Sequence, residues 1–345
     1  MLDNTRHLAT LATITNLRPI PDADSIEVGT VRGWDVVVAR GDFSDGEAVI
    51  YIEPDAALPV TDPRFAFLAP RGTKMIDDEP YHVLKTIRLR GQLSQGIVFH
   101  ASDFMPKADT ADLDTALGIK LWEPPAPPVG ADQIGPWDVR WLRKTDAERV
   151  QNLSDDWLAG VDDGLWVPTE KVDGTSLTFV LDDGRLRVYS RNWELSTADP
   201  ESSPLQLARR HDLADWMRRH QVDALQGEMY GEGVNGNRLK IKGQRLALFA
   251  AWSRDVSRAT DRFDILYDAA TSQGLETAPR LDGLPFPRTV RSALAQADGM
   301  KSLVTPAVLA EGIVWHHPGE RLFPELDYRP VFKAVANSYL LKHGL

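Results

Sequence analysis

Short stretches of alternating hydrophobic and polar residues, separated by turn-forming residues, characterise the first third of the chain. Turn sequences such as Arg40-Gly41-Asp42 and Ser44-Asp45-Gly46 divide these stretches. About five short strands joined by such turns predict a small β barrel over residues 1–122. The apolar or alternating runs that predict these strands lie mainly at 34–39, 48–52, 84–89 and 97–99.

The most proline-rich part of the chain begins at Glu123 and ends at Gly130, with four prolines in between. Proline is excluded from helix interiors and central strands, because it lacks an N–H and fixes its own backbone angle. The segment 123–136 is therefore predicted to be an extended linker. It separates the barrel from a second predicted domain over residues 137–345.

Helix and strand patterns are mixed after the linker. Thr145 and Glu148 have capping-box spacing, which predicts a helix from Thr145 to Val150. Helical spacing of apolar residues predicts a helix over 205–220, and another is predicted over 262–272, ended by Gly274. Strands are predicted between the helices, at 177–181 and 246–252. The predicted fold class is α+β, with antiparallel sheets flanked by helices.

The composition is that of a globular protein large enough for two domains. Of the 345 residues, 43% are hydrophobic, 26% are charged and none is cysteine. The lack of cysteine excludes a disulfide scaffold, a thiolate zinc site and a cysteine nucleophile. No apolar run of about 18 residues could span a membrane, and Asp3, Arg6 and His7 interrupt the N-terminal region. We therefore expect a cytoplasmic monomer that does not interact with membranes.

The net charge of −11 is unusual for a protein that binds nucleic acid. Binding depends on the local field rather than on the average charge, however, and basic residues are clustered. Each cluster could be an ordinary solvated face or a contact surface for nucleic acid, and we predict the latter. The clusters comprise Lys85, Arg88 and Arg90 before the linker, and Arg238, Lys240 and Lys242 after it.

A lysine followed by aspartate and glycine, Lys171-Val172-Asp173-Gly174, is the first candidate for chemistry. A lysine amine is a covalent nucleophile once it loses its proton, and a neighbouring positive charge favours that loss. Asp173 shares the Lys171 face of an extended chain, and Gly174 permits a tight turn. Taken alone, the pattern is also that of a surface turn between two strands.

Further segments follow the lysine in a fixed order, and the set is more specific than any one of its members. These segments are Ser190–Asn192, Gln226–Asn237, Leu246–Trp252, Glu311–Val314 and Val331–Lys333. The series resembles motifs I, Ia, III, IIIa, IV and V of the covalent nucleotidyltransferase superfamily. It is most similar to ATP-dependent RNA ligases of the Deinococcus and Naegleria type, RNA ligase family 5. Residues 21–34 look like the N-terminal OB-type domain of the same group.

This resemblance implies an ATP-dependent RNA ligase that joins RNA 3′-hydroxyl and 5′-phosphate ends. The reaction would pass through lysyl-AMP on Lys171 and then through an adenylylated 5′ end. ATP and a divalent metal, Mg²⁺ or Mn²⁺, are the implied cofactors. The expected substrate is a nicked duplex with an RNA 3′-hydroxyl strand, as in RNA repair.

The resemblance also implies roles for individual side chains. Lys171, Lys333 and Asp173 are the implied catalytic residues. Asp173 would hold metal-bound water or cap the turn. The implied metal residues are Glu311, Glu228 and Asp173. The implied nucleotide contacts are Glu170 and Phe249 at adenine, Arg191 and Glu228 at the ribose, Arg149 and Lys333 at the phosphates, and Glu311 near the metal.

The last motif departs from a pattern that is common in RNA ligases. A Lys-x-Lys pair is expected there, but Val331 and Val335 flank Lys333 on either side. Lys333 would therefore act alone, or share its role with Lys342 or an arginine.

Three other functions fit parts of the pattern. A DNA ligase or a capping-type nucleotidyltransferase would share the lysine motif, but these enzymes usually carry the OB domain after the catalytic domain. A non-catalytic RNA-binding OB protein would not need Lys171, Glu228, Glu311 and Lys333 together. The order of the predicted domains and the complete motif set favour the RNA ligase.

Overall fold

The structure, a computed structural model, describes residues 7–104, 112–123, 130–162, 164–255, 258–263, 265–267, 273–318, 323–326 and 330–345. The chain forms two compact units. The first comprises Met1–Pro125, Gln151–Ser154 and Leu340–Leu345, and the second comprises Ala126–Val150 and Asp155–Tyr339. Residues 124–129 of the predicted linker, and 264 and 268–272 of the predicted helix at 262–272, lie outside the described residues.

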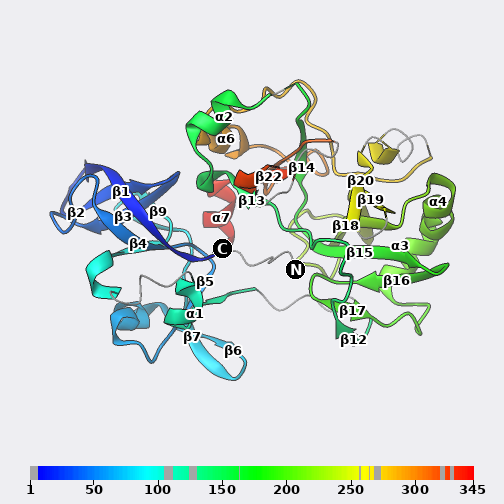
Figure 1. Cartoon of the computed structure of the whole chain (residues 1–345), viewed down its shortest axis with the longest axis horizontal. Coiled ribbons are helices and arrows are strands. Elements are labelled where there is room, and N and C mark those ends of the chain that lie inside the picture. The colour runs from blue at the N-terminus through cyan, green and yellow to red at the C-terminus, as the bar shows by residue number, and fades with distance from the viewer. Residues whose placement is uncertain are drawn as a thin grey trace. The chain divides into compact units, whose positions relative to one another are not determined.

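The first unit is built on a five-stranded antiparallel sheet in the order β10-β4-β1-β2-β3 (Figure 1). Its core contains Trp34 and Tyr51, whose ring centroids are 6.3 Å apart. The sheet curls beyond its edge strand β3. There Val37 N donates to Ser94 Oγ at 3.1 Å, which joins β3 to the segment that contains Ser94. The strands are β1 (Ala9–Ile20), β2 (Ala23–Val31), β3 (Trp34–Ala39), β4 (Ala48–Ile52) and β10 (Ile97–His100).

Smaller elements cover a second core in this unit, around Leu58 and Phe65. The strand predicted at 84–89 is confirmed only at 87–89, because β7 ends at Val83 and β8 begins at Ile87. The other elements are β5 (Ala56–Pro59), η1 (Pro63–Arg71), β6 (Lys74–Ile76), β7 (Glu79–Val83), β8 (Ile87–Leu89), β9 (Gln92–Ser94), η2 (Ala101–Phe104), α1 (Leu113–Leu117) and β11 (Lys120–Leu121). Strands β11-β5-β7-β6 form one sheet, and β8-β9 form a hairpin.

Two short segments from later in the chain complete the first unit. Asn152, at the end of η4 (Val150–Asn152), accepts a hydrogen bond from Trp34 Nε1 at 2.8 Å and donates one to Glu53 Oε1 at 2.9 Å. Near the end of the sequence, Leu345 O accepts a hydrogen bond from Thr86 N at 3.2 Å. The first unit therefore includes two segments from later in the chain, which the predicted division at a single linker does not include.

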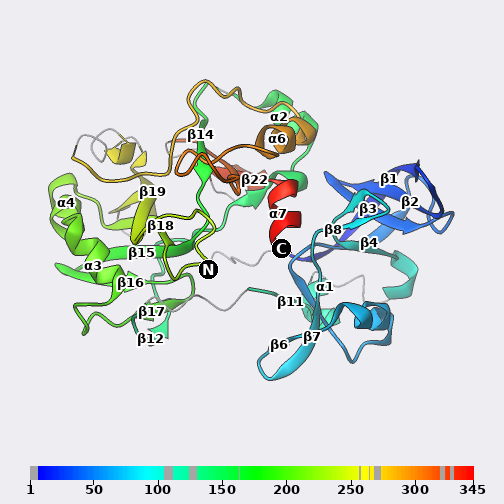
Figure 2. The same cartoon turned by 180° about the vertical axis from the view of Figure 1, so that it is seen from behind.

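The second unit contains a seven-stranded sheet in the order β12-β17-β16-β15-β18-β19-β20. Its strands are β12 (Gln133–Pro136), β15 (Thr175–Asp182), β16 (Arg185–Tyr189), β17 (Trp193–Leu195), β18 (Ala224–Gly231), β19 (Gln244–Asp255) and β20 (Arg258–Asp261). Helices α3 (Ser203–Arg210) and α4 (Leu213–His220) lie beside this sheet in both views (Figures 1 and 2), and Trp216 packs into the shared core.

A four-stranded sheet in the order β13-β22-β21-β14 forms the other half of this unit. The strands are β13 (Glu148–Arg149), β14 (Val167–Lys171), β21 (Gly312–His316) and β22 (Val331–Val335). One face carries an aromatic core in which Trp315 and Phe332 stack at 5.1 Å. Trp157, from α2 (Asp155–Gly160), packs edge-on against Phe332. Helix α6 (Val290–Ala297) lies beside α2 in Figure 2, and the remaining elements are η5 (Pro324–Leu326) and α7 (Asn337–His343).

The structure confirms the strands predicted at 34–39, 48–52, 177–181 and 246–252, and corrects two predicted helices. The helix predicted from Thr145 is wrong, because β13 pairs in parallel with β22 and overrides the local capping pattern. The predicted helix at 205–220 is divided, because Asp212 adopts a left-handed conformation (φ 47°) between α3 and α4. In the described part of the chain, no helix has the length and apolar character needed to cross a membrane.

Candidate active site

Lys171 is the last residue of β14, at the point where the chain leaves the four-stranded sheet and enters β15 of the seven-stranded sheet. Strand register places Lys171, Val314 and Lys333 on one face of the four-stranded sheet, and Arg149 pairs with Lys333 at its edge. The opposite face carries the buried aromatic core. Alternation along β14, β22 and β13 therefore places Lys171, Lys333 and Arg149 on a single face.

The amine of Lys171 forms an ion pair with Glu311, with Nζ 2.7 Å from Oε2. The Lys171 side chain is 25% exposed. Burial alone lowers the pKa of Lys171, but the negative charges of Glu311, Glu228 and Asp173 outweigh it and hold this pKa above its usual range. The amine is therefore protonated at neutral pH in the protein alone, and a nucleophilic role requires these charges to be offset.

Glu228 lies on β18, opposite Ser176 of β15. Burial raises its pKa to about 8, and the charges of Glu311 and Asp173 add to this while that of Lys171 opposes it. Among the described residues, none donates a hydrogen bond to the Glu228 carboxylate. Glu228 and Glu311 thus offer hard oxygen ligands that fit a divalent cation or a ribose hydroxyl.

Glycine is required where the lysine segment meets its neighbours. A side chain on Gly174 would overlap the carbonyl oxygen of Met229 and crowd the Glu228 side chain. At Gly312, opposite Lys171, an added side chain would overlap the carbonyl oxygen of Ala334. These close backbone approaches bring Lys171, Glu228 and Glu311 together.

Asp173 is buried, and its carboxylate accepts hydrogen bonds from three side chains. Asn235 Nδ2 donates at 3.0 Å and Arg238 Nη1 at 3.2 Å. The Tyr339 hydroxyl is the third donor. Asp173 therefore joins the lysine turn to two distant segments, which the sequence did not predict.

Phe249 occupies a β-bulge, because Gln226 pairs with Ala250 while the next residue, Gly227, pairs with Leu248. The bulge leaves the Phe249 ring partly exposed and packed on an apolar cluster that includes Val172. An exposed aromatic face beside the lysine motif can stack on a base, as predicted from the resemblance.

The side chain of Glu170 points away from Lys171, since neighbouring residues of a strand alternate. It is 1% exposed, and it accepts hydrogen bonds from Ser302 Oγ at 2.5 Å and from Leu303 N at 2.6 Å. Burial raises the pKa of Glu170, and these hydrogen bonds oppose the rise. Its carboxylate fixes the loop at Ser302, so an adenine contact by Glu170 remains a prediction.

The predicted cations are not all in one place. Arg191 is 41% exposed and pairs with Asp146, with Nη2 2.8 Å from Oδ1. Arg149 is buried beside Lys333. Lys342 is exposed in the last turn of α7, in a segment that belongs to the first unit. Lys333, rather than Lys342, therefore shares a sheet face with Lys171.

In each of the two basic clusters predicted to bind nucleic acid, some side chains bond to other residues of the protein and others are exposed. Arg238 is committed to Asp173, whereas Lys240 and Lys242 are exposed and pair with no described acidic residue. In the first unit, the ammonium group of Lys85 donates to a backbone carbonyl, that of Gly344. Arg90 and Gly91 form the left-handed turn of the β8–β9 hairpin, so Arg90 is not in a strand with Arg88 as predicted.

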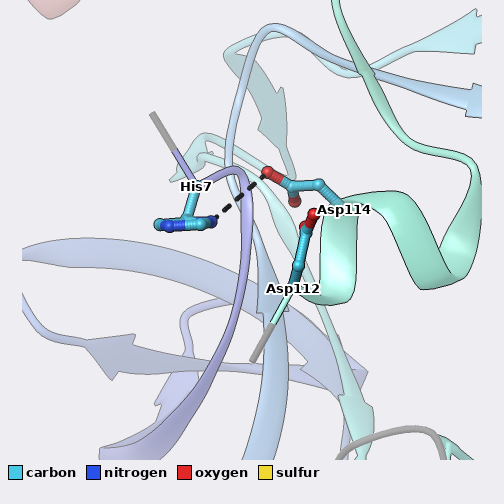
Figure 3. Close-up of side chains that lie close together, drawn as sticks. All are labelled: His7, Asp112 and Asp114. Atoms are coloured by element: carbon cyan, nitrogen blue, oxygen red, sulfur yellow. Dashed lines mark ion pairs between the residues drawn. The ribbon is translucent and has the colours of Figure 1, made fainter. Parts of the chain in front are cut away.

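Outside this site, His7, Asp112 and Asp114 lie close together in the first unit (Figure 3). Asp114 accepts hydrogen bonds from Leu8 N and Ala9 N and so fixes the start of β1. Asp112 caps α1 by accepting from Thr115 N. Both carboxylates therefore have a structural role in the fold.

Tyr339, Asn235 and Ser302 are the site residues that sequence reasoning missed. Each acts through a hydrogen bond to a motif residue more than 60 positions away. Only the Asn235-Gly236-Asn237 sequence, a turn signal within the third motif, could have indicated one of them.

Two family descriptions match the chain, an OB-fold domain over residues 8–101 and an RNA ligase over residues 164–335. A Naegleria gruberi RNA ligase structure with PPi is 32% identical, with a TM-score of 0.85 and 99% of each chain covered. The chain belongs to the RNA ligase family. Two mutant structures of the Naegleria gruberi ligase, one with ATP and Mn and one with AMP and Mn, are also 32% identical to this RNA ligase. Their TM-scores are 0.84 and 0.85, over 98% of this chain and 99% of theirs.

A search of curated proteins gives no match to this RNA ligase. The matches above confirm the predicted α+β fold with an N-terminal OB-type barrel and a later ligase domain. They also confirm the predicted RNA ligase activity over the predicted DNA ligase, capping-enzyme and non-catalytic alternatives.

Proposed function

We propose that this RNA ligase consumes ATP and a divalent metal, and that Lys171 carries AMP during the reaction. The observation that carries the proposal is the Lys171 amine, held 2.7 Å from Glu311 on the face shared with Lys333 and Arg149. The Naegleria gruberi enzyme, solved with ATP and Mn and with PPi, supports the same cofactors here.

The chemistry on this chain proceeds in three group transfers. Lys171 Nζ loses a proton and attacks the α-phosphorus of ATP, so that a P–N bond forms, the bond to the bridging oxygen breaks and pyrophosphate leaves. An oxygen of the RNA 5′-phosphate then attacks the same phosphorus and releases the Lys171 amine. Finally, the RNA 3′-hydroxyl attacks the activated 5′-phosphate, AMP leaves, and the strand is joined.

The carboxylates fit a divalent cation, because Glu228 has no described hydrogen-bond donor and lies with Glu311 near the amine. Glu228 and Glu311 would hold the ion, and Asp173 would reach it through water. When bound, the ion supplies positive charge that favours the deprotonated amine and offsets the charge of the phosphates.

Lys333 and Arg149 would bind the triphosphate. Their side chains emerge at paired positions of β22 and β13, on the face that carries Lys171. Fixed positive charge there stabilises the negative charge that develops as pyrophosphate leaves. We assign Lys333 to the α-phosphate, Arg149 to the β- and γ-phosphates, Phe249 to adenine and Arg191 to the ribose or the RNA end.

The proposed substrate is a nicked duplex with an RNA 3′-hydroxyl strand, sealed by a cytoplasmic monomer. Exposed Lys240 and Lys242 follow the third motif, and exposed Arg88 and Arg90 lie in the first unit. These residues supply local positive charge on an acidic chain.

The test is to incubate the protein with ATP labelled in its α-phosphate and with Mg²⁺ or Mn²⁺, and then to denature it. Label should remain on the wild-type protein and be absent from Lys171→Ala. The adduct should be labile to acid and stable to alkali, as expected of a phosphoramidate. Label on Lys171→Ala, or none on the wild type with either metal, would contradict the proposal.

Sealing assays distinguish the substrates. Duplexes with one nick, carrying RNA or DNA on its 3′-hydroxyl side, are compared with single-stranded RNA at equal concentration. We expect the RNA 3′-hydroxyl nick to be sealed fastest. Equal sealing of the DNA nick would remove the proposed requirement for RNA.

A further inference from the structure

The carboxylate of Asp173 is the meeting point of three segments of the second unit. It lies in the turn between β14 and β15, two residues after Lys171. Arg238 and Asn235 reach it from the loop after β18, and Tyr339 reaches it from α7. The carboxylate is 6% exposed, so water contributes little to its stabilisation.

The loop that supplies Asn235 and Arg238 is held in shape by its own contacts. Asn235 and Asn237 both adopt left-handed conformations, with φ of 45° and 49°. The Asn237 side chain accepts from Ile241 N at 3.1 Å and donates to Ile241 O at 2.8 Å. Asn235 Nδ2 also donates to Gly174 O at 2.6 Å. The loop thus presents its donors to the lysine turn in a fixed position.

Tyr339 comes from a different element, α7. It is the third residue of α7, which begins at Asn337, two residues after the end of β22. Its side chain is 2% exposed, and its hydroxyl donates to Asp173 Oδ2. Burial, together with the charge of Asp173, raises the pKa of Tyr339, so the hydroxyl is protonated at neutral pH and can donate to Asp173. The chain segment that carries Lys333 is thereby tied to the turn that follows Lys171.

We propose that Tyr339 is a positioning residue for lysine adenylylation: its hydroxyl bond to Asp173 fixes the position of Lys171 relative to Lys333. The inference rests on the proposed function, since it concerns the step that forms lysyl-AMP. Tyr339 itself touches no substrate. It acts by holding the nucleophile and the phosphate-binding cation, which come from different strands, in register for attack on one phosphorus.

The test compares Tyr339→Phe with a matched control, Tyr189→Phe. Tyr189 is also fully buried in the second unit, and its hydroxyl also donates to an aspartate, Asp138 Oδ1, at 2.7 Å. Both substitutions remove one buried hydroxyl and keep the ring. Single-turnover formation of lysyl-AMP is measured at varied ATP concentration, and the melting temperature of each protein is recorded.

For Tyr339→Phe we expect the maximal rate of adenylylation to fall by about 10- to 100-fold, because misplacement by about 1 Å carries a cost of this size. The ATP concentration at half-maximal rate should change by less than about 2-fold, since the nucleotide contacts remain. Tyr189→Phe should keep the wild-type rate of adenylylation even if its melting temperature falls as much as that of Tyr339→Phe. Equal rates for Tyr339→Phe and wild type, or equal losses in the two variants, would overturn the proposal.

A double substitution separates positioning from general damage. In Asp173→Asn, the amide offers a single uncharged acceptor to the Tyr339 hydroxyl. Adding Tyr339→Phe to this variant should therefore lower the adenylylation rate much less than it does in the wild type. Fully additive losses would show that Tyr339 acts independently of Asp173 and would also overturn the proposal. If the wild type forms no lysyl-AMP at all, the proposed function itself fails, which is a different result from a wild-type rate in Tyr339→Phe.

Discussion

At the scale of single residues, burial makes one carboxylate of the site costly to ionise. Glu311 is paired with Lys171, and Asp173 is paired with Arg238. Glu228 accepts no hydrogen bond from the described residues, and burial, with the charges of Glu311 and Asp173, raises its pKa to about 8. The same buried carboxylate that is costly to ionise in the protein alone offers its oxygens to a metal ion or to a ribose hydroxyl.

Glu228→Gln should therefore stabilise the metal-free protein while it slows adenylylation by about 10²–10³-fold. The pKa of the Glu228 carboxyl is raised from 4.5 to about 8 in the folded state. The folded wild-type protein therefore loses stability as the pH rises through that interval. The gain in melting temperature over wild type should be near zero at pH 5 and largest above pH 8. Thermal melts with EDTA at both pH values measure it, and a gain that is larger at pH 5 would contradict the assignment.

Lys333→Ala should lower the rate of lysyl-AMP formation by about 10²–10³-fold, because it removes a fixed charge from the face that carries Lys171. Lys342→Ala is the matched control, since it removes the same charge from an exposed position in α7. Its adenylylation rate should stay near that of wild type. A larger loss in Lys342→Ala would mean that the last motif has been assigned to the wrong lysine.

At the scale of elements, the crossing of the chain from β14 to β15 organises the site. The crossing is tight, because the turn at Gly174 passes against the backbone of Met229 in β18. This contact sets Lys171 beside Glu228, although 57 positions separate them in the chain. The geometry of the nucleophile thus depends on a packing contact between two backbones as well as on the side-chain bonds to Asp173.

Gly174→Ala should destabilise the protein by about 1–3 kcal/mol and depress adenylylation, because the new methyl group would displace the turn or β18. Gly160→Ala, at the end of α2, is the control, since an added side chain there meets nothing within 4 Å. Urea denaturation and the lysyl-AMP assay test both variants. Equal stability of Gly174→Ala and Gly160→Ala would refute the close approach.

Elements with strong local patterns were predictable from the sequence, and elements formed by distant pairing were not. The run 246–252 predicts its strand from apolar content alone, and β19 contains it. The residues around Thr145 have a helix-start pattern, but Glu148 and Arg149 form strand β13 because they pair with β22. The motifs located Lys171, Glu228, Glu311 and Lys333 by chemistry and order, whereas Tyr339 depends on a contact across 166 positions that no local pattern contains.

At the scale of the whole molecule, an acidic chain must bind a polyanion. Two of the basic side chains predicted to bind RNA are bonded to other residues of the protein. Arg238 pairs with Asp173, and Lys85 donates to the carbonyl of Gly344. Lys240 and Lys242 remain exposed next to the third motif. Affinity for RNA should therefore depend on few residues, and it should be sensitive to salt.

Replacing Lys240 and Lys242 by alanine together should weaken nicked-duplex binding and reduce its salt dependence. Each phosphate contact contributes a slope of about 0.7–0.9 in log affinity against log salt, so the slope should fall by about 1.4–1.8. Binding is measured by anisotropy over a salt series. Lysyl-AMP formation without RNA should be unchanged, and an unchanged salt slope would exclude these lysines from the RNA surface.

The grouping of two later segments with the first unit limits how such a ligase can be altered. Residues 151–154 and 340–345 are grouped with the first unit, although both lie within a few residues of Arg149 or Tyr339. A barrel taken from another protein and fused ahead of residue 130 would lack partners for Asn152, which here bonds both Trp34 and Glu53. The barrel therefore cannot be replaced on its own, and a working graft would need residues that bond Asn152 at the positions of Trp34 and Glu53.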